Sequence, residues 1–169
     1  VLATERLSHF NTDGVDIAVR YGRPPFGPGL NTEHLFDQHI VAVGSPALLD
    51  SLGAPQAVGD LSQFMLLHDA HNLWPQFIAQ AFAQPLANAP KNVRFNQTSL
   101  AIEAAIAGQG LALASHFFVQ DDLRAGRLRC VSDQQLDLDT GFYLVWPRKS
   151  RHAAAQAVVR QWLLDQASQ

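Results

Sequence analysis

Two stretches of this 169-residue chain, residues 13–22 and 103–114, constrain its fold more than any other feature. In each, a glycine joins a segment predicted as a helix to an apolar segment predicted as a strand. Gly14 ends the first of these helices and Gly108 ends the second. Glycine suits this place because it enters the left-handed backbone conformation that ends many helices at little cost. The repeated order of helix, glycine and strand indicates an α/β fold.

Short apolar runs bounded by turn residues predict the strands. A stretch rich in glycine and proline at residues 23–29 is expected to be a surface loop. Residues 121–127 are expected to form a turn. The predicted strands are residues 15–19, 35–44, 64–68, 93–95, 111–114, 128–131 and 142–146.

Helices are predicted where a capping residue precedes an apolar stripe of helical period. Ser45 and Pro46 begin one such helix, and Gly53 ends it. A short helix capped by Thr4 is predicted to carry Leu7 and Phe10. Further helices are predicted at residues 74–82 and from a cap at Thr98 or Ser99 to residue 107. The last predicted helix has Ala154, Val158 and Trp162 on one face.

Alternating strands and helices of these lengths indicate an α/β fold with mostly parallel sheets. Residues 45–133 are expected to close as one lobe. Residues 1–44 and 134–169 are expected to form the other lobe, joined to the first by two crossing connections. Two lobes of this kind leave a cleft between them, and hinge closure is their usual motion.

The composition indicates a folded domain that does not itself contact nucleic acid. Hydrophobic residues make up 47% of the chain, which allows a buried core, and 16% charged residues are too few for a disordered segment. The net charge is −3, and the densest basic run is residues 148–151, whereas a nucleic-acid surface needs a basic stripe. No membrane association is expected, because no apolar run is long enough to span a bilayer and no signal peptide is present.

The single cysteine, Cys130, cannot form an internal disulfide. Its place in a predicted strand favours a buried thiol over a reactive one. A chain with one cysteine and no disulfide fits a reducing cytosol, so a cytoplasmic location is expected.

The motifs of common enzymes are absent, so neither catalysis nor a cofactor is expected. The chain has no G-x-S-x-G nucleophile turn and no phosphate loop that ends in Gly-Lys-Ser/Thr. Gly108 and Gly110 lack the third glycine of a dinucleotide-binding turn, and they follow a helix instead of opening one. No metal is expected either, because His68, Asp69 and His71 are too close in sequence to converge on one ion.

Polar residues that follow predicted strands or open predicted helices are candidates for ligand binding. In parallel α/β lobes, ligands bind beyond the carboxyl ends of the strands, where the free amide groups of helix N-termini also point. This chemistry suits a carboxylate, a phosphate or another polar oxygen. The candidate residues are Thr4, Arg20, Tyr21, His68, Asp69, Thr98, Ser99 and Ser115.

Each candidate also has a plainer structural role. Serine and threonine at helix starts are usually caps. Arg20 can pair with an anionic ligand, but it can equally hold the following loop or pair with Asp13 or Asp16. His68 either lines the cleft or is hydrogen-bonded at its rim.

Seven short phrases, taken in order, carry a resemblance to a known family. They are residues 13–22, 43–46, 60–61, 66–69, 108–113, 122–128 and 143–148, and together they span almost the whole chain. In order and spacing they resemble the effector-binding domain of LysR-type bacterial transcription regulators, in the branch of the glycine-cleavage and β-lactamase activators. The resemblance implies a type II periplasmic-binding-protein-like fold with two Rossmann-like lobes. It also implies that the Thr4 hydroxyl faces the effector.

The same resemblance implies a small-molecule sensor. Such a domain binds a small effector, here polar or anionic, between its lobes and assembles into a dimer or tetramer. It contacts DNA only through an N-terminal winged helix-turn-helix, which this chain lacks, and the chain starts at the family's second strand. The alternative is a solute-binding protein that serves a transporter, which would share the fold and the cleft. An enzyme that has adopted this fold is the third hypothesis.

Overall fold

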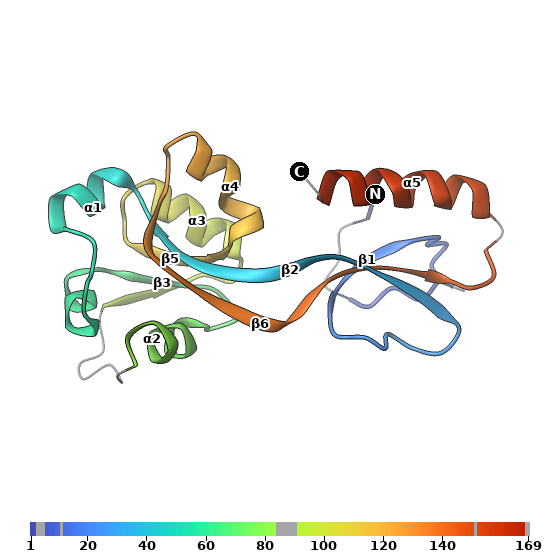
Figure 1. Cartoon of the computed structure of the whole chain (residues 1–169), viewed down its shortest axis with the longest axis horizontal. Helices are drawn as coiled ribbons and strands as arrows, with labels where there is room; N and C mark the ends of the chain where they lie inside the picture. Colours follow the sequence, from blue (N-terminus) through green and yellow to red (C-terminus); the bar gives the residue numbers. More distant parts are fainter. Residues whose placement is uncertain (3–5, 11, 84–90, 151, 168–169) are drawn as a thin grey trace. The chain divides into compact units, whose positions relative to one another are not determined.

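The chain divides into two compact units, which we describe separately (Figure 1). Unit 1 comprises Val1–Gln38 and Leu138–Gln169, and unit 2 comprises His39–Asp137. The divisions expected from the sequence, at 44/45 and 133/134, lie a few residues inside unit 2. None of the described helices is long and apolar enough to cross a membrane. The computed structural model describes residues 1–2, 6–10, 12–83, 91–150 and 152–167.

Strands and helices alternate along the described chain, and only β2 and β6 have residues in both units. The strands are β1 (Ala18–Gly22), β2 (Leu30–Gly44), β3 (Leu66–His68), β4 (Asn92–Arg94), β5 (Leu111–Ser115) and β6 (Arg129–Pro147). The helices are α1 (Pro46–Leu52), the 3-10 helix η1 (Val58–Gln63), α2 (Trp74–Phe82), α3 (Thr98–Ile106), α4 (His116–Arg124) and α5 (Ala153–Ala167).

The strand pairing is mixed, whereas the sequence favoured mostly parallel sheets. In unit 2 the strands stand in the order β2, β5, β3, β4. β3 is parallel to both β4 and β5, while β5 is antiparallel to β2. In unit 1, β1 is antiparallel to β6. The parallel pairs involve β3, β4 and β5, which follow one another along the chain through the helical connections α2 and α3, and parallel strands require such crossovers.

Helix α1 begins and ends where the sequence predicts. The Ser45 Oγ accepts a hydrogen bond from the Leu48 backbone N–H at 3.2 Å, and Pro46 is the first helical residue. Gly53 follows the last turn with a φ of 79°, a value that favours glycine. The helix packs through Leu49, which is buried. The cap, the proline and the glycine therefore act as the sequence analysis expected.

Helix α2 spans Trp74–Phe82, the bounds predicted from its apolar stripe. Trp74, Phe77 and Ile78 are buried on one face of the helix. The Trp74 indole N–H donates a hydrogen bond of 3.0 Å to the backbone carbonyl of Leu67 at the end of β3. Burial of the ring therefore leaves no unsatisfied donor.

Two layers of helices cover the unit 2 sheet, with α3 and α4 on one side and α2 on the other (Figure 1). The core under α3 and α4 takes alternate residues from the three central strands, because successive side chains of a strand point to opposite faces. Its members include Val41 and Val43 of β2, Leu67 of β3, Ala112 and Ala114 of β5, Ala101 and Ala105 of α3, and Val119 of α4.

Glycine is needed at positions 108 and 110, between α3 and β5, for two different structural reasons. Gly108 has a φ of 74° and ends the helix in the left-handed conformation. At Gly110 a Cβ atom would lie 2.2 Å from the carbonyl oxygen of Met65. Only glycine allows β5 to start this close to β3, where the Leu111 N–H donates to the same carbonyl at 2.9 Å. The glycine pair is therefore a packing motif between α3 and two strands.

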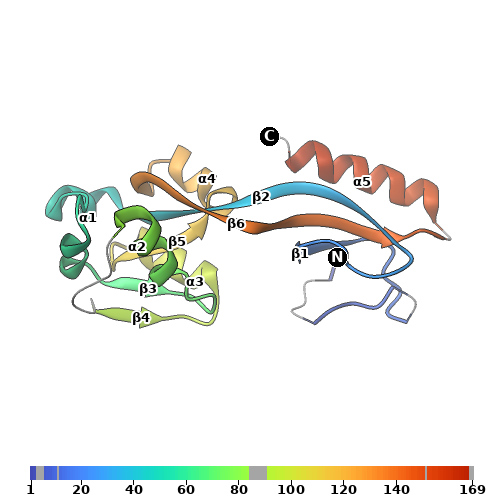
Figure 2. The ribbon, with the colours of Figure 1, turned by 60° about the horizontal axis from the view of Figure 1, so that its bottom comes forward.

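Unit 1 is a small antiparallel arrangement with one long helix, α5, alongside its strands (Figure 2). β1 pairs with β6 from Ala18 opposite Val145 to Gly22 opposite Gly141. Helix α5 is attached through the buried side chain of Gln156, whose Nε2 donates to the backbone carbonyl of Asp16. The apolar face predicted for this helix is exposed: Val158 and Trp162 are 71% and 58% accessible.

Two predictions for the N-terminal part are wrong. Residues 6–10 are not helical, and Leu7, expected to pack, is 65% exposed, so no tertiary contact supports so short a helix. The predicted cap, Thr4, lies outside the described residues. The strand predicted for residues 15–19 instead begins at Ala18, because pairing with β6 selects which residues are extended.

Two predictions for the C-terminal half are wrong as well. Residues 116–124 form helix α4, whose last turn at residues 121–124 takes up the beginning of the expected turn, and the chain turns only at Ala125 and Gly126. Burial of Val119 against the core stabilises this helix. The two predicted strands at 128–131 and 142–146 are parts of the single strand β6.

Candidate functional site

The carboxyl ends of β3 and β5 bring two of the candidate residues onto one face of the unit 2 sheet. β3 ends at His68 and β5 ends at Ser115, and the two strands are parallel neighbours with Leu67 opposite Ala112. Because Leu67 and Ala114 point into the core under α3 and α4, His68 and Ser115 point to the other face. The strand spacing and a two-residue offset place their Cβ atoms about 8 Å apart.

His68 is held as a neutral imidazole. It is only 8% exposed, and burial lowers its pKa below the ordinary histidine value. Its Nδ1 lies 3.1 Å from the Oδ1 of Asn72, which also accepts a hydrogen bond from Arg94 Nη1 at 3.2 Å. Since a carbonyl oxygen only accepts, this amide orientation puts the ring hydrogen on Nδ1. The Nε2 atom is then a hydrogen-bond acceptor.

Asp69 ties the loop after β3 to the start of α3. Its Oδ2 accepts a hydrogen bond of 2.7 Å from Thr98 Oγ1, and its Oδ1 accepts one of 2.9 Å from the His71 backbone N–H. Both oxygens therefore have partners within the protein. Asp69 holds the loop in place and orients the threonine.

The expected cap of α3 is wrong. Gln97 occupies the cap position with an extended backbone and no side-chain cap hydrogen bond, and Thr98 is the first helical residue. The Thr98 hydroxyl donates its hydrogen to Asp69 instead. Ser99, the next residue, is exposed on the first turn, where backbone N–H groups have no partner within the helix.

Ser115 is the most unusual residue of the site. Its side chain is 2% exposed, and its Oγ has no hydrogen-bond partner among the described residues. It stands at the cap position of α4 with an extended backbone, yet makes no side-chain cap hydrogen bond. A buried hydroxyl without a partner destabilises a fold by about 1–3 kcal/mol. A bound ligand with a polar group would remove this cost.

Two further residues of the site, Asn72 and Arg94, were missed by the sequence analysis. Asn72 has a φ of 52°, in the left-handed region that asparagine tolerates better than most residues. Arg94 ends β4 directly opposite His68 in the parallel pairing. The rule that ligands bind at the carboxyl ends of parallel strands would have selected Arg94, because β4 was predicted. No local signal marks Asn72.

The remaining candidates, Arg20 and Tyr21, lie on β1 in unit 1. Arg20 Nη2 donates to the carbonyl oxygen of Ser8 at 2.8 Å, and the guanidinium stands 5.0 Å from the centre of the Phe10 ring. The hydroxyls of Tyr21 and Thr140 are 2.7 Å apart. Both side chains thus have structural partners within their own unit.

We term the unit 2 site the β3–β5 cluster: His68, Asp69, Asn72, Arg94, Thr98 and Ser115. It offers an acceptor at His68, a hydroxyl at Ser115 and a positive charge at Arg94. A serine nucleophile needs a hydrogen-bonded base, and among the described residues Ser115 has no such bond to His68. No described group of three His, Cys, Asp or Glu side chains is arranged to hold a metal ion. The arrangement suits recognition of a small polar ligand.

Comparison with known proteins relates almost the whole chain to one family. The family model described as the LysR substrate binding domain matches residues 2–168. The chain is 33% identical over 169 residues to the glycine cleavage system transcriptional activator of Escherichia coli K12, covering 99% of this chain and 55% of that protein. It is 32% identical over 165 residues to the HTH-type transcriptional regulator TrpI of Pseudomonas aeruginosa, covering 90% and 52%. The chain therefore spans about half the length of these curated relatives.

Solved structures share the fold. The effector domain of the transcriptional regulator AmpR of Pseudomonas aeruginosa matches with a TM-score of 0.73 and 24% identity, over 95% of this chain and 76% of that one. The AmpR effector binding domain from Citrobacter freundii matches with a TM-score of 0.75 and 20% identity, over 96% and 79%. The architecture is thus that of type II periplasmic-binding-protein-like domains, as the sequence resemblance implied.

Proposed function

Since the chain belongs to the LysR substrate-binding domain family, we propose that it is the ligand-sensing and oligomerising part of a LysR-type bacterial transcription regulator. The β3–β5 cluster binds a small polar or anionic effector. The buried Ser115 hydroxyl without a described partner carries this proposal, because β5 ends at Ser115 next to β3, which ends at the buried, neutral His68, and α/β folds bind ligands at such strand ends.

The contacts of the cluster define how the effector is recognised. A hydroxyl or N–H group of the effector donates to His68 Nε2, and a second polar group hydrogen-bonds to Ser115 Oγ. An anionic group lies near Arg94 and the first turn of α3, whose N–H groups attract negative charge. Asp69 keeps the threonine at this turn in place. The cleft between two lobes stays a prediction, as do contacts of the effector with Thr4, Arg20 and Tyr21.

Regulation follows from a shift in populations. A ligand that binds one conformation better than another favours that conformation by its difference in binding free energy. In the whole regulator this bias passes through subunit contacts of a dimer or tetramer to a separate DNA-binding domain. We place this regulator in the cytoplasm, with DNA contacted only by the N-terminal winged helix-turn-helix.

The named relatives favour a regulator over the transporter-associated alternative. Both curated relatives described above are transcriptional regulators, and both solved domains belong to a transcriptional regulator.

Calorimetric titration of the chain with amino acids, small carboxylates and sugar derivatives tests the proposal. We expect one class to bind in a 1:1 ratio, and Ser115→Ala to weaken that binding by about tenfold, the effect of losing one well-made buried hydrogen bond. The matched control is Ser51→Ala, which removes an exposed hydroxyl on α1 that bonds to its own helix. Absence of binding across the panel, with unchanged operator binding by the full-length regulator, would contradict the proposal.

A further inference from the structure

Helix α5 in unit 1 presents an apolar stripe at its surface. Val158, Val159 and Trp162 are all exposed, and Ala155 is exposed one turn before them. Residues three and four apart are neighbours on a helix, so these four side chains form one continuous stripe. Apolar residues that gather in this way on a surface mark a site of protein–protein contact. We term these four residues the α5 stripe.

Polar residues attach α5 to the strands of unit 1. Gln156 is buried, and its Nε2 donates to the backbone carbonyl of Asp16. Arg160 Nε lies 3.3 Å from the Glu33 carboxylate, and the guanidinium stands 5.2 Å from the centre of the Trp146 ring. A surface helix usually turns its apolar side to the core and its polar side to water. In α5 polar groups face inward and the α5 stripe is left exposed.

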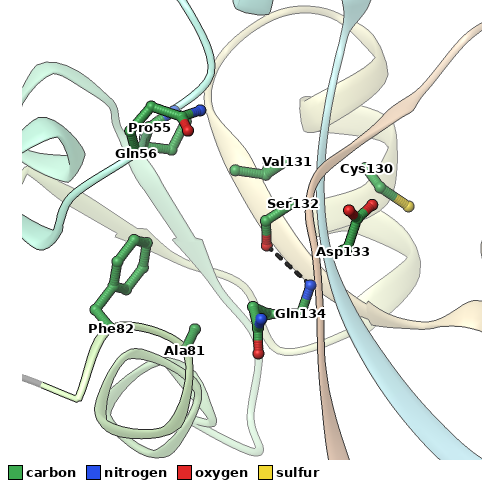
Figure 3. A pocket seen from close by; sticks show the side chains of 9 residues that line it. All are labelled: Pro55, Gln56, Ala81, Phe82, Cys130, Val131, Ser132, Asp133 and Gln134. Atoms are coloured by element: carbon green, nitrogen blue, oxygen red, sulfur yellow. Dashed lines mark hydrogen bonds between the residues drawn. The ribbon is translucent and has the colours of Figure 1, made fainter.

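The α5 stripe differs from the pocketed surface of unit 2. There, a pocket of about 450 Å³ lies between the end of α2, the segment after α1 and the beginning of β6 (Figure 3). Its lining mixes the polar Gln56 and Gln134 with the apolar Phe82 and Val131. The α5 stripe has only apolar side chains, and residues 153–159 include no charged residue. Its chemistry suits another apolar helix.

The α5 stripe is complementary in size to a second copy of itself. We consider two antiparallel copies of α5 with a two-fold axis between Val158 and Val159, because such an axis brings the same surface of both copies together. Val158 then lies opposite Val159 of the second copy. Trp162 lies opposite Ala155 of the second copy, since both are equally far from the axis. The small alanine leaves room for the indole ring.

The flanks of the stripe are complementary in chemistry as well. In the same pairing, His152 lies opposite Asp165 of the second copy, and both residues are exposed. An imidazole N–H donates to a carboxylate. Asp165 Oδ1 accepts one hydrogen bond, from Gln161 Nε2 at 2.9 Å, and a carboxylate can accept several. Each end of the antiparallel pair therefore joins a hydrogen-bond donor to an acceptor.

We propose that the α5 stripe binds the α5 stripe of a second copy of this chain as an antiparallel pair, with Trp162 of each copy packed on Ala155 of the other. A tryptophan at the centre of a small interface carries much of its binding free energy. The contact gives the oligomerising role a specific surface, and its place in a regulator rests on the proposed function.

The association of isolated chains is weak. α5 has 15 residues and is about 22 Å long, so one pair of helices buries less than the roughly 1,200–2,000 Å² of a stable complex. We expect a dissociation constant on the order of 100 μM. In a regulator that is already dimeric, the copies hold one another at a high effective concentration, so a contact this weak is sufficient.

Sedimentation equilibrium of the chain, from about 5 to about 500 μM, tests the association. We expect the average mass to rise from monomer toward dimer. Trp162→Glu weakens association by at least about thirtyfold, the loss expected for a central aromatic residue. Ala155→Gln fills the space opposite the ring and weakens association by about tenfold. The matched control, Leu52→Glu, changes an exposed apolar residue of α1 in unit 2 and leaves association unchanged.

Disulfide formation tests the antiparallel direction, in a Cys130→Ser background that removes the native thiol. Val158→Cys places the two thiols beside the axis, so oxidation links the chains. Gln166 lies near one end of α5, so in an antiparallel pair the thiols of Gln166→Cys are on the order of 20 Å apart and do not link. A parallel pair would link through both positions.

A chain that stays monomeric throughout would overturn the proposal, because something other than a second copy would then cover the stripe. Unchanged association in Trp162→Glu, or linkage through Gln166→Cys, would also overturn it. Circular dichroism checks that the variants fold, and if Trp162→Glu does not, Ala155→Gln and the disulfides decide. Trp162→Glu retains effector binding and Ser115→Ala retains self-association, so failure of this proposal is distinguishable from failure of the proposed effector site.

Discussion

The two units of the chain use their apolar residues in different ways. In unit 2, α2, α3 and α4 sandwich the sheet and most of the apolar side chains of its central strands are buried. Among the described residues of unit 1, the apolar side chains that are fully buried are Leu144 and Val145. Unit 1 relies on rings that pack across its strands, with centroids 4.7 Å apart for Phe36 and Phe142 and 5.1 Å apart for Tyr21 and Phe142.

This difference explains why the side chains of the β3–β5 cluster are well ordered by their neighbours in unit 2. A recognition site works when the elements that carry it are rigid and its side chains are locked by their neighbours. His68 and Ser115 are the last residues of strands packed on both faces, and Asp69 and Asn72 fix the loop between β3 and α2. In unit 1, Arg20 and Tyr21 lie on β1, whose residues are either exposed or only partly buried.

Truncation of one aromatic residue in each unit should give the largest difference in the free energy of unfolding. Phe77 is 2% exposed and Trp162 is 58% exposed. We predict that Phe77→Ala lowers the free energy of unfolding by about 3–5 kcal/mol, because it removes contacts and leaves a cavity. Trp162→Ala should change it by less than about 0.5 kcal/mol. Urea denaturation followed by circular dichroism measures both, and equal losses would remove the distinction between the units.

The close approach of β5 to β3 predicts the next largest effect on the free energy of unfolding. In Gly110→Ala the new methyl group would meet the Met65 carbonyl, so we expect the free energy of unfolding to fall by about 3 kcal/mol. Gly59→Ala is the control, because nothing lies within 4 Å of a Cβ atom at that position. If Gly110→Ala unfolded at the same urea concentration as the control, β3 and β5 would not approach as closely as described.

His68 predicts a pH dependence that arises in unit 2. Its pKa is lowered in the folded state by burial, so below the unfolded value of 6.5 the unfolded state binds a proton that the folded state does not. The folded state is therefore destabilised as the pH falls through and below 6.5. His68→Gln should lose part of this dependence relative to the unaltered chain. Unfolding curves at several pH values measure the difference, and parallel profiles for the two proteins would contradict a neutral, buried imidazole.

Ser115→Ala should have the smallest effect on stability, and its sign is informative. Removing a buried hydroxyl that has no described partner leaves the free energy of unfolding unchanged or raises it by up to about 1 kcal/mol. The same denaturation experiment measures this change. A clear loss of stability would mean that the hydroxyl has a structural role in the ligand-free protein.

Local signals in the sequence were sufficient for the regular parts of unit 2. Ser45, Pro46 and Gly53 act only on neighbouring backbone, so their effect on α1 can be predicted without the fold. The stripe in α2 likewise predicts the buried face that contains Trp74 and Phe77. The ends of β3 and β5, and with them His68 and Ser115, follow from the apolar runs that precede them.

Elements that depend on tertiary contacts could not be predicted in the same way. Helix α4 contains histidine, phenylalanine, valine and aspartate, which have modest helix propensity, and burial of Val119 decides its conformation. β6 passes through residues 132–141, most of which are polar, and they are extended because neighbouring strands pair with them and not because of their own preference. Asn72 joins the site only because the fold brings it to His68 and Arg94.

The most direct test of the account is to locate a bound effector by hydrogen exchange. With the effector found by titration, the account predicts slower exchange in the peptides that cover residues 66–72 and 111–119, at the ends of β3 and β5. In Ser115→Ala this protection should be strongly reduced at the same effector concentration. Protection confined to other parts of the chain, or equal protection in the variant, would contradict an effector site at the β3–β5 cluster.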